Sequence, residues 1–244
     1  MSIDTQVNDH LLLLCGKSAT GKSTSLRNLP MENTMFLNTE NGKKRPFKGT
    51  AKWDKVITDP LQLFEAFDYA ESQPDCKYIV IDSLTFLLEM YVSMYVNGAK
   101  DGREAWGNFQ QYFKRLMQEK VAKSSKFVIF TAHTADKLNE TEMVIETAVP
   151  VPGALKNNGI EAYFSTVIYT KKMKLSDLKV ENDLLVITEK DKARGFKYVF
   201  QTDVTAGTLA ERIRGPMGMW EDDEIFIDND VMHVAKRFHE YYGA

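Results

Sequence analysis

The sequence lacks several features that would place the chain in particular classes of protein. It has only two cysteines, Cys15 and Cys76, which have no metal-ligand spacing and adjoin apolar runs, so we interpret them as core residues. No apolar run approaches the roughly 20 residues that cross a bilayer. The first residues show no basic segment followed by an apolar signal segment. We therefore expect an intracellular, cytoplasmic protein with no membrane partner.

The chain also lacks internal repeats and low-complexity linkers, and its 244 residues can bury a sizeable core. Hydrophobic residues make up 43% and charged residues 27% of the sequence, as in an ordinary globular protein. The net charge of −3 is unevenly distributed, because residues 221–244 are rich in acids and the rest is slightly basic. We predict a single domain over residues 1–244, in which residues 203–244 form a C-terminal extension with an acidic, solubilising segment.

Apolar runs alternate with helical patterns along most of the chain. Five runs are typical of buried strands: Leu11–Cys15, Met35–Leu37, Tyr78–Ile81, Phe127–Phe130 and Phe164–Tyr169. Helical periodicity covers Leu61–Ala70, Ser83–Val96, Glu104–Ala122 and Val231–Tyr242, and Pro30 ends a short helix that begins near residue 23. Two further strands are predicted at Leu184–Thr188 and Tyr198–Gln201, around a turn at Ala193–Gly195. The alternation predicts an α/β fold with a mainly parallel, twisted sheet, helices on both faces and a β-rich C-terminal part.

The most informative motif directly follows the first apolar run. Residues Gly16–Ser23 have the pattern GxxxxGK(S/T), a glycine-containing loop between a strand and a helix. Such a loop aims backbone N–H groups at a polyphosphate, while Lys22 reaches the β and γ phosphates and the Ser23 hydroxyl holds Mg²⁺. The motif therefore predicts a site for ATP and Mg²⁺. The predicted cofactor-binding residues are Gly16, Lys17, Ser18, Ala19, Thr20, Gly21, Lys22, Ser23 and Thr24.

Polar side chains follow three other predicted strands. Asp82 ends the run at Tyr78–Ile81 and is a candidate to hold Mg²⁺ through water. Glu40 follows the second strand, at the edge of the sheet where ligands bind in open α/β folds. It is either the base that orients the attacking water or an exposed loop residue. His133 follows the fourth strand and is either a sensor of the γ phosphate or a surface histidine.

In this order the motifs resemble the core of the RecA-type recombinases. The resemblance rests on Gly16–Ser23, Phe36–Glu40, Ile79–Ser83 and Ile129–His133, and it covers roughly residues 10–202. It implies a RecA-like P-loop ATPase core in which Glu40 is the catalytic base. It also places His133 where the family usually has a glutamine that couples ATP to DNA binding.

The resemblance continues into the predicted DNA-binding loops. Val151–Lys156 and Ala162–Val167 look like the end of the family's second DNA-binding loop and the strand after it, and Asn97–Arg103 occupies the place of the first loop. The implied DNA-binding residues are Lys100, Arg103, Lys137 and Lys156, with Met143, Val144 and Ile145 offering apolar surface to the bases. The alternative is a mobile loop with ordinary surface lysines.

Other lysines raise the question of oligomerisation. Glu189–Lys192 resembles the paired lysines that RecA-type proteins insert into a neighbouring subunit's ATP site. The resemblance thus implies that Lys190 and Lys192 act catalytically in trans within a filament or ring, with Arg194 as the alternative.

Lys17 has the position of the ParA-type signature lysine, but Ser18 and Ala19 replace the accompanying glycines, so we interpret it as an ordinary loop lysine. We interpret two more basic clusters as solvated faces, although either can line a DNA path: Lys43–Arg45, and Lys171 with Lys172 and Lys174.

The small size of the core and the ending Gly215–Trp220 are similar to the phage-encoded RecA-like ATPases that assist single-strand annealing. This similarity implies a DNA-stimulated ATPase in the host cell cytoplasm that binds single-stranded DNA, with a single-strand DNA-binding protein as a further candidate partner.

Two alternative functions remain open. One is a nucleotide-dependent switch or interaction module in which Glu40 is idle. The other is a small P-loop kinase, although the sequence shows no arginine-rich lid.

Overall fold

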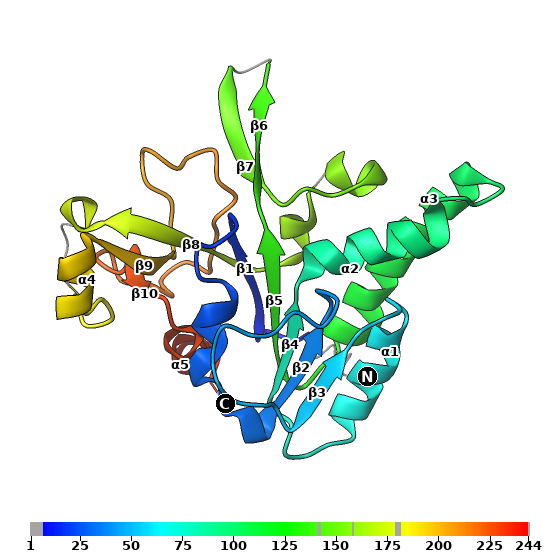
Figure 1. Cartoon of the computed structure of the whole chain (residues 1–244), viewed down its shortest axis with the longest axis horizontal. Coiled ribbons are helices and arrows are strands. Elements are labelled where there is room, and N and C mark those ends of the chain that lie inside the picture. Colours follow the sequence, from blue (N-terminus) through cyan, green and yellow to red (C-terminus); the bar gives the residue numbers. More distant parts are fainter. Residues whose placement is uncertain (1–6, 141–142, 158, 179–181, 244) are drawn as a thin grey trace, which may run out of the picture.

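An eight-stranded mixed sheet forms the centre of the molecule (Figure 1). The computed structural model describes residues 7–140, 143–157, 159–178 and 182–243. The strands of the sheet are β1 (Leu11–Gly16), β2 (Thr34–Asn38), β3 (Trp53–Val56), β4 (Tyr78–Asp82), β5 (Phe127–His133), β8 (Thr166–Lys174), β9 (Phe196–Gln201) and β10 (Phe226–Asp228). Their order across the sheet is β10-β9-β8-β1-β5-β4-β2-β3.

The strands from β8 to β3 run parallel to one another, whereas β9 and β10 are antiparallel additions. This arrangement confirms the RecA-like P-loop α/β fold that the alternating sequence pattern and the motifs predicted. It also brings the ends of β1, β5, β4 and β2 to one edge, because carboxyl ends of parallel neighbours coincide. Gly16 is thus paired with His133, and Asn38 is paired with Asp82.

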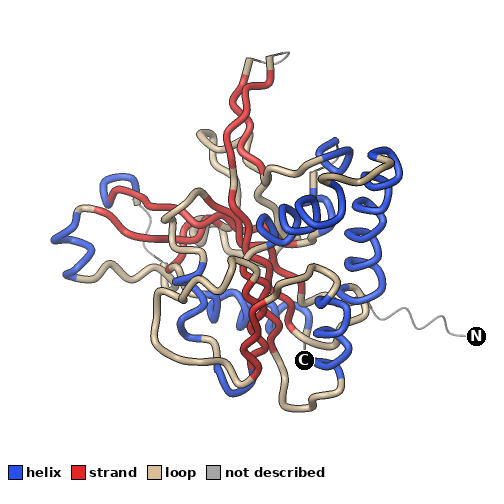
Figure 2. Tube along the Cα trace, turned by 45° about the vertical axis from the view of Figure 1, so that its right-hand side comes forward, coloured by secondary structure: helices blue, strands red, loops and turns tan. Residues whose placement is uncertain are grey.

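Helices cover both faces of the sheet (Figure 2). One face carries α1 (Gln62–Glu71), α2 (Leu84–Tyr91) and α3 (Gly102–Arg115), of which α2 and α3 continue into the π-helical turns Val92–Val96 and Leu116–Val121. The other face carries α5 (Val231–Tyr242) and the short 3₁₀ helix Ser23–Asn28. The sequence predicted these helices to within about two residues, including the early stop before Pro30.

The core consists of two apolar layers, one on each face of the sheet. In β1, Leu11, Leu13 and Cys15 face the layer under α1–α3, while Leu12 and Leu14 face the layer under α5. This period of two follows from the pleat of a strand. Cys15 and Cys76 are free thiols and are both buried, as the interpretation as core residues expected.

A two-stranded hairpin projects from the edge of the sheet at which β5 ends (Figures 1 and 2). It consists of β6 (Ala135–Asn139) and β7 (Val144–Ala148), paired antiparallel. This ribbon occupies the position of the predicted second DNA-binding loop. After it, the 3₁₀ helix Gly153–Asn157 packs on α3 so closely that a Cβ atom on Gly153 would lie 2.7 Å from Trp106 Cε3.

The predicted strand at Leu184–Thr188 is wrong. This segment lies beside β10, where the Asp228 amide donates to the Leu184 carbonyl at 2.8 Å. The Val186 amide then donates to the side chain of Asp228 at 3.1 Å. A continuing strand would instead use this amide for a backbone hydrogen bond to its neighbour, so strand pairing ends here. The predicted turn at Ala193–Gly195 is instead the end of a short helix, α4 (Glu189–Arg194), closed by Gly195 at φ 73°.

Part of the acidic C-terminal segment belongs to the fold, whereas Glu221–Asp223 are exposed, as a solubilising segment would be. Glu224 is buried and pairs with Arg237, Asp228 pairs with Lys197, and Asp230 caps the start of α5 by accepting from the Met232 amide. These acids therefore attach β10 and α5 to the sheet. Within the described part of the chain, no helix has both the length and the apolar character that a membrane crossing needs.

Candidate functional site

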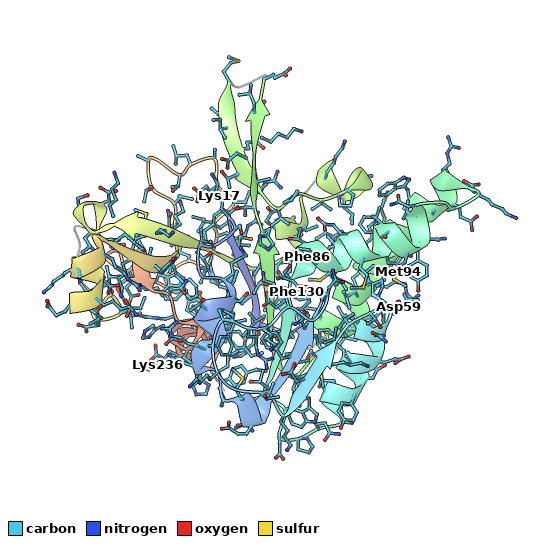
Figure 3. All side chains as sticks on the ribbon, viewed as in Figure 1. Lys17, Asp59, Phe86, Met94, Phe130 and Lys236 are labelled. Carbon is cyan, nitrogen blue, oxygen red and sulfur yellow. The ribbon has the colours of Figure 1, made fainter. Side chains whose placement is uncertain are left out.

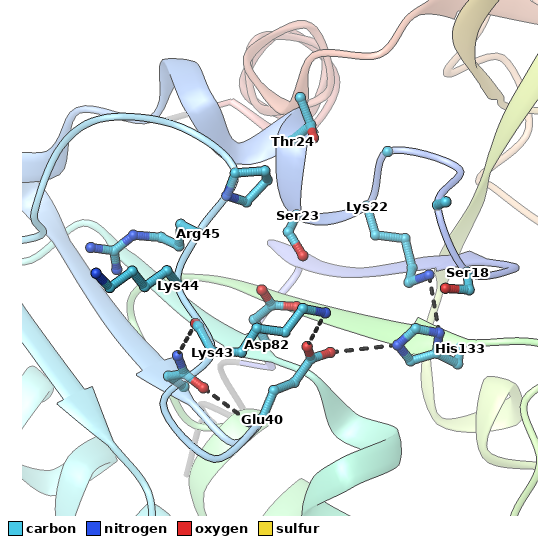
Figure 4. A pocket seen from close by; sticks show the side chains of 14 residues that line it. Ser18, Lys22, Ser23, Thr24, Glu40, Lys43, Lys44, Arg45, Asp82 and His133 are labelled. Carbon is cyan, nitrogen blue, oxygen red and sulfur yellow. Dashed lines mark hydrogen bonds and ion pairs between the residues drawn. The ribbon is translucent and has the colours of Figure 1, made fainter.

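A cavity of about 220 Å³ opens at the edge of the sheet where β1, β5, β4 and β2 end (Figure 4). Its lining includes Ser18, Ala19 and Gly21–Thr24 from the loop after β1. The opposite wall holds Glu40, Asp82 and His133, together with Lys43–Pro46 from the loop after β2. The structure thus brings together the predicted phosphate loop and the three predicted polar strand ends.

The residues of the phosphate loop that do not line the cavity determine the shape of the loop. A Cβ atom on Gly16 would lie 2.2 Å from Thr170 Oγ1, so no side chain fits at this position. The Thr20 hydroxyl donates to the Lys17 carbonyl at 2.8 Å and so closes the turn. Gly21 has φ +102°, a conformation that side-chain-bearing residues rarely adopt.

Lys17 is not among the residues that line the cavity and instead connects the loop to the hairpin, near the base of which it lies (Figure 3). Its ammonium group lies 2.6 Å from Asp136 Oδ2 on β6, and Asp136 also accepts from the Thr147 hydroxyl on β7 at 2.8 Å. The structure gives no support to a role like that of the ParA-type lysine. The interpretation as an ordinary loop lysine missed this contact between two segments that are far apart in the sequence.

Lys22 is almost completely buried in the loop, with 6% of its surface exposed. Its ammonium group donates to the carbonyls of Gly16 and Lys17, both at 2.9 Å, and lies 3.3 Å from His133 Nδ1. Burial lowers the pKa of Lys22 to about 8, while the carboxylates of Asp82 and Glu40 oppose that shift. The three contacts match the three donors of an ammonium group, so a phosphate oxygen has to replace one of them.

Threonine hydroxyl groups fix the strand ends around the cavity. Thr39 donates to the Ser83 carbonyl at 2.6 Å and so connects the end of β2 to the end of β4. Thr131 on β5 donates to Asp82 Oδ1 at 2.5 Å, and Thr85 at the start of α2 accepts from the backbone amide of His133 at 2.9 Å. These hydrogen bonds hold the predicted catalytic groups on a rigid frame.

Both carboxylate oxygens of Glu40 are occupied. Oε2 lies 2.7 Å from the Lys43 ammonium group, and Oε1 lies 3.5 Å from His133 Nε2. Because Lys22 can only donate, His133 Nδ1 accepts, and the ring proton is on Nε2 facing Glu40. The hydrogen bond from His133, together with Lys43, lowers the pKa of Glu40 to about 2, although burial acts in the opposite direction.

Ser23 and Asp82 offer the ligands that Mg²⁺ prefers. Asp82 is buried, and this burial raises its pKa, while hydrogen bonds from Thr131 and Ser23 counteract the shift. A hydroxyl oxygen beside a buried carboxylate fits a hard cation that also takes phosphate oxygens and water. Among the described residues no cluster of three or more histidine, cysteine or acidic side chains can hold a metal ion.

The sequence reasoning missed Asn229, which lies against the phosphate loop. Its side chain is 6% exposed, its Nδ2 has no hydrogen-bond partner in the described structure, and its Oδ1 is 3.0 Å from where a Cβ of Gly21 would lie. It lines a second cavity, of about 390 Å³, together with Thr24, Arg27 and Tyr198. No sequence pattern indicates this position, because only the pairing of β10 with β9 places Asn229 beside the loop.

The other predicted site residues lie outside the cavity. Lys190 and Lys192 are exposed on α4, and Lys192 pairs with Glu189 at 2.7 Å, so neither reaches the phosphate loop of its own chain. Lys100, Arg103, Lys137 and Lys156 are all exposed. Lys137 is on β6 and Lys156 on the following 3₁₀ helix, while Lys100 and Arg103 lie at the start of α3. They do not form one cluster with the nucleotide site.

The fold and the site define a P-loop nucleotide-binding protein with a RecA-like α/β core. The chain belongs to the AAA domain family, whose profile matches residues 9–203. Among solved structures it is similar to the flagellar accessory protein FlaH from Methanocaldococcus jannaschii, with 12% identity over 80% of this chain and 78% of that chain and a TM-score of 0.35. No curated protein matches the sequence. Family membership supports nucleotide binding and ATPase activity as the general function.

The buried ammonium group leads to a prediction about stability. Replacing Lys22 with methionine should raise the free energy of unfolding of the nucleotide-free protein at pH 7 by about 1–3 kcal/mol, since each unit of lowered pKa costs about 1.4 kcal/mol. Below pH 8 the folded wild type carries the proton at this cost. It releases the proton near pH 8, whereas the unfolded chain keeps its proton up to about pH 10.5, so the stability of the wild type rises over that range. The advantage of Lys22→Met should therefore shrink over that range.

Urea unfolding at pH 7 and pH 9.5 measures both effects. The exposed Lys48, in the loop after β2, provides the matched control, and Lys48→Met should change stability by less than about 0.5 kcal/mol at either pH. A Lys22→Met protein that is less stable than wild type at pH 7 would contradict the prediction.

Proposed function

We propose that the chain is a Mg²⁺-dependent ATPase that binds single-stranded DNA and assists homologous recombination or strand annealing of the phage type. The observation that best supports ATP hydrolysis is the position of Glu40 across the cavity from Lys22, with His133 in contact with both. A carboxylate facing the phosphate loop is the arrangement that an ATPase needs, because phosphoryl transfer requires an oriented water and neutralised phosphate charge.

The residues divide this work between them. Water attacks the γ phosphorus, the bond to the β–γ bridging oxygen breaks, and ADP leaves with that electron pair while Glu40 takes a proton from the water. Lys22 neutralises charge on the β and γ oxygens, and the loop amides hold the rest of the polyphosphate. Bound Mg²⁺ supplies further charge neutralisation, and Ser23 and Asp82 are the residues that hold it.

Glu40→Gln should keep ATP binding and reduce turnover by about 10²-fold or more, as expected for loss of a positioned general base. Phosphate release at saturating ATP measures turnover, and titration with a fluorescent ATP analogue measures binding. Glu32→Gln serves as the control, because Glu32 is an exposed glutamate near the start of β2 and should leave both quantities unchanged. Unchanged turnover in Glu40→Gln would remove Glu40 from the mechanism.

The hairpin supports the proposal of single-stranded DNA as partner. Its apolar side chains are unusually exposed, with Met143 at 76%, Ile145 at 62% and Leu138 at 51%, and Lys137 lies among them. Apolar faces with a few cations suit bases and backbone of a single strand. The hairpin also follows His133 almost directly, so it begins where the nucleotide site ends.

The salt dependence of DNA binding should reflect at most four phosphate contacts per protomer. If Lys100, Arg103, Lys137 and Lys156 each contact one phosphate, the slope of log K against log salt should be no steeper than about −3 per protomer. Fluorescence anisotropy with a labelled oligonucleotide between low and moderate salt measures it, and the same DNA should stimulate ATP turnover. Turnover indifferent to DNA would favour the nucleotide switch, and phosphate transfer to an added nucleoside monophosphate would favour the kinase.

Lys190 and Lys192 are proposed to complete the site of a neighbouring copy in a filament or ring, with Arg194 as the alternative. Their exposure on α4, away from the cavity of their own chain, supports a role in trans. A Lys22→Ala protein mixed with a Lys190→Ala/Lys192→Ala protein should recover part of the ATP turnover, because some interfaces then combine an intact loop with intact lysines. Turnover of the mixture equal to the sum of the two separate proteins would refute shared sites.

A further inference from the structure

The loop after β2 carries a lysine into the nucleotide site that no motif explains. Lys43 lines the same cavity as the phosphate loop, and its ammonium group lies 2.7 Å from Glu40 Oε2 (Figure 4). The Glu40 side chain is only 8% exposed, whereas that of Lys43 is 68% exposed. The Glu40 side chain is therefore held in the wall of the cavity, whereas the exposed Lys43 side chain has room to change its rotamer.

A tight turn places Lys43 in this position. The Lys43 amide donates to the Glu40 carbonyl at 3.0 Å, and the two residues between them, Asn41 and Gly42, have φ 52° and 74°. Positive φ at both central residues is the mark of a type I′ turn, for which Asn-Gly is the favoured pair. The side chain of Asn38 holds both ends, accepting from the Glu40 amide at 2.9 Å and donating to the Lys43 carbonyl at 2.8 Å.

The other basic side chains of this loop are arranged differently. Arg45 is tied to Asp54 and to the Gly49 carbonyl and lies over the ring of Phe36, so it cannot move to a ligand without losing these contacts. Lys44 lines the cavity but makes no hydrogen bond or ion pair in the part of the chain that the structure describes. Lys43 is thus the cation of the loop that contacts the candidate base.

We propose that Lys43 pairs with Glu40 until a triphosphate binds and then transfers to the terminal phosphate, which frees Glu40 to act on water. The inference rests on the proposed ATPase function. A terminal phosphate carries more negative charge than one carboxylate, so the ammonium group gains by the exchange. A diphosphate offers no oxygen at that position and leaves Lys43 on Glu40.

A chain of contacts across the cavity supports this exchange. Lys43 contacts Glu40, Glu40 contacts His133, and His133 contacts Lys22, so the groups that would act on the nucleotide are occupied by one another. The low pKa of Glu40 makes it a weak base in this state, whereas a general base works best with a pKa near the operating pH. The hydrogen bond from His133 is the main cause of this low pKa and Lys43 adds to it, so moving Lys43 to a triphosphate raises the basicity of the carboxylate in part.

The test compares affinities for ADP and for the β,γ-imido analogue of ATP, measured by calorimetry with Mg²⁺. Lys43→Met should weaken binding of the analogue by about tenfold, the size of one partly exposed charged contact, and leave ADP affinity within about twofold of wild type. Lys43→Arg should retain most of the preference for the analogue. Lys48→Met, in the same loop but outside the cavity, should match wild type for both ligands.

Crystal structures of the two complexes provide a readout that a merely structural role would not move. We expect Lys43 on Glu40 in the ADP complex and on oxygens of the terminal phosphate in the complex with the analogue. An unchanged preference in Lys43→Met, a loss of preference in Lys44→Met alone, or Lys43 on Glu40 in both complexes would overturn the inference. A wild-type protein that binds neither nucleotide would instead refute the proposed function.

Discussion

The nearly buried ammonium group of Lys22 is the constraint on which the arrangement of the site depends. The loop after β1 wraps around it so that two backbone carbonyls and His133 receive its contacts. Burial disfavours the charged form, and Asp82 and Glu40 are the charges that offset this. The phosphate loop, the end of β4 and the end of β2 are therefore coupled electrostatically.

The sheet satisfies this constraint through its register. Parallel pairing of β1 with β5 and of β2 with β4 sets Gly16 beside His133 and Asn38 beside Asp82. Threonine hydroxyl groups then connect neighbouring strand ends directly and so help to fix the positions of the polar groups. The apolar runs that bury the strands thus also determine where the chemistry of the protein is located.

Apolar runs and the glycine-rich motif made the centre of this fold predictable from the sequence. Strands β1, β4 and β5 are buried on both faces and so read as continuous apolar segments, whereas β3 is a partly exposed edge strand without such a run. The segment at 184–188 has the composition of a strand, but a single side chain, that of Asp228, ends its pairing. The local sequence pattern could not show that the Val186 amide bonds to a side chain about forty positions away instead of to a neighbouring strand.

Some residues of the candidate site could likewise be predicted from the sequence, and others could not. Lys22, Glu40, Asp82 and His133 follow apolar runs and could be named from the sequence, although their roles could not. The approach of Lys43 to Glu40 had a signal that was not used, because the Asn41-Gly42 pair is typical of a turn that folds the chain back on itself. Asn229 had none, since its position depends on β10, a strand of three residues.

The connection between the nucleotide site and the hairpin runs through the Gly16 carbonyl rather than through the more conspicuous ion pair. Lys17 and Asp136 are 59% and 42% exposed, and such pairs contribute only about 0.2–1 kcal/mol. The Gly16 carbonyl accepts from Lys22 at 2.9 Å and also from the amide of Thr134 at 3.1 Å, which is the residue that joins β5 to the hairpin. The backbone of β5 is paired with β1 on one side and with β4 on the other. The Gly16 carbonyl and the His133 ring are thus two contacts of Lys22 that lie where the hairpin begins.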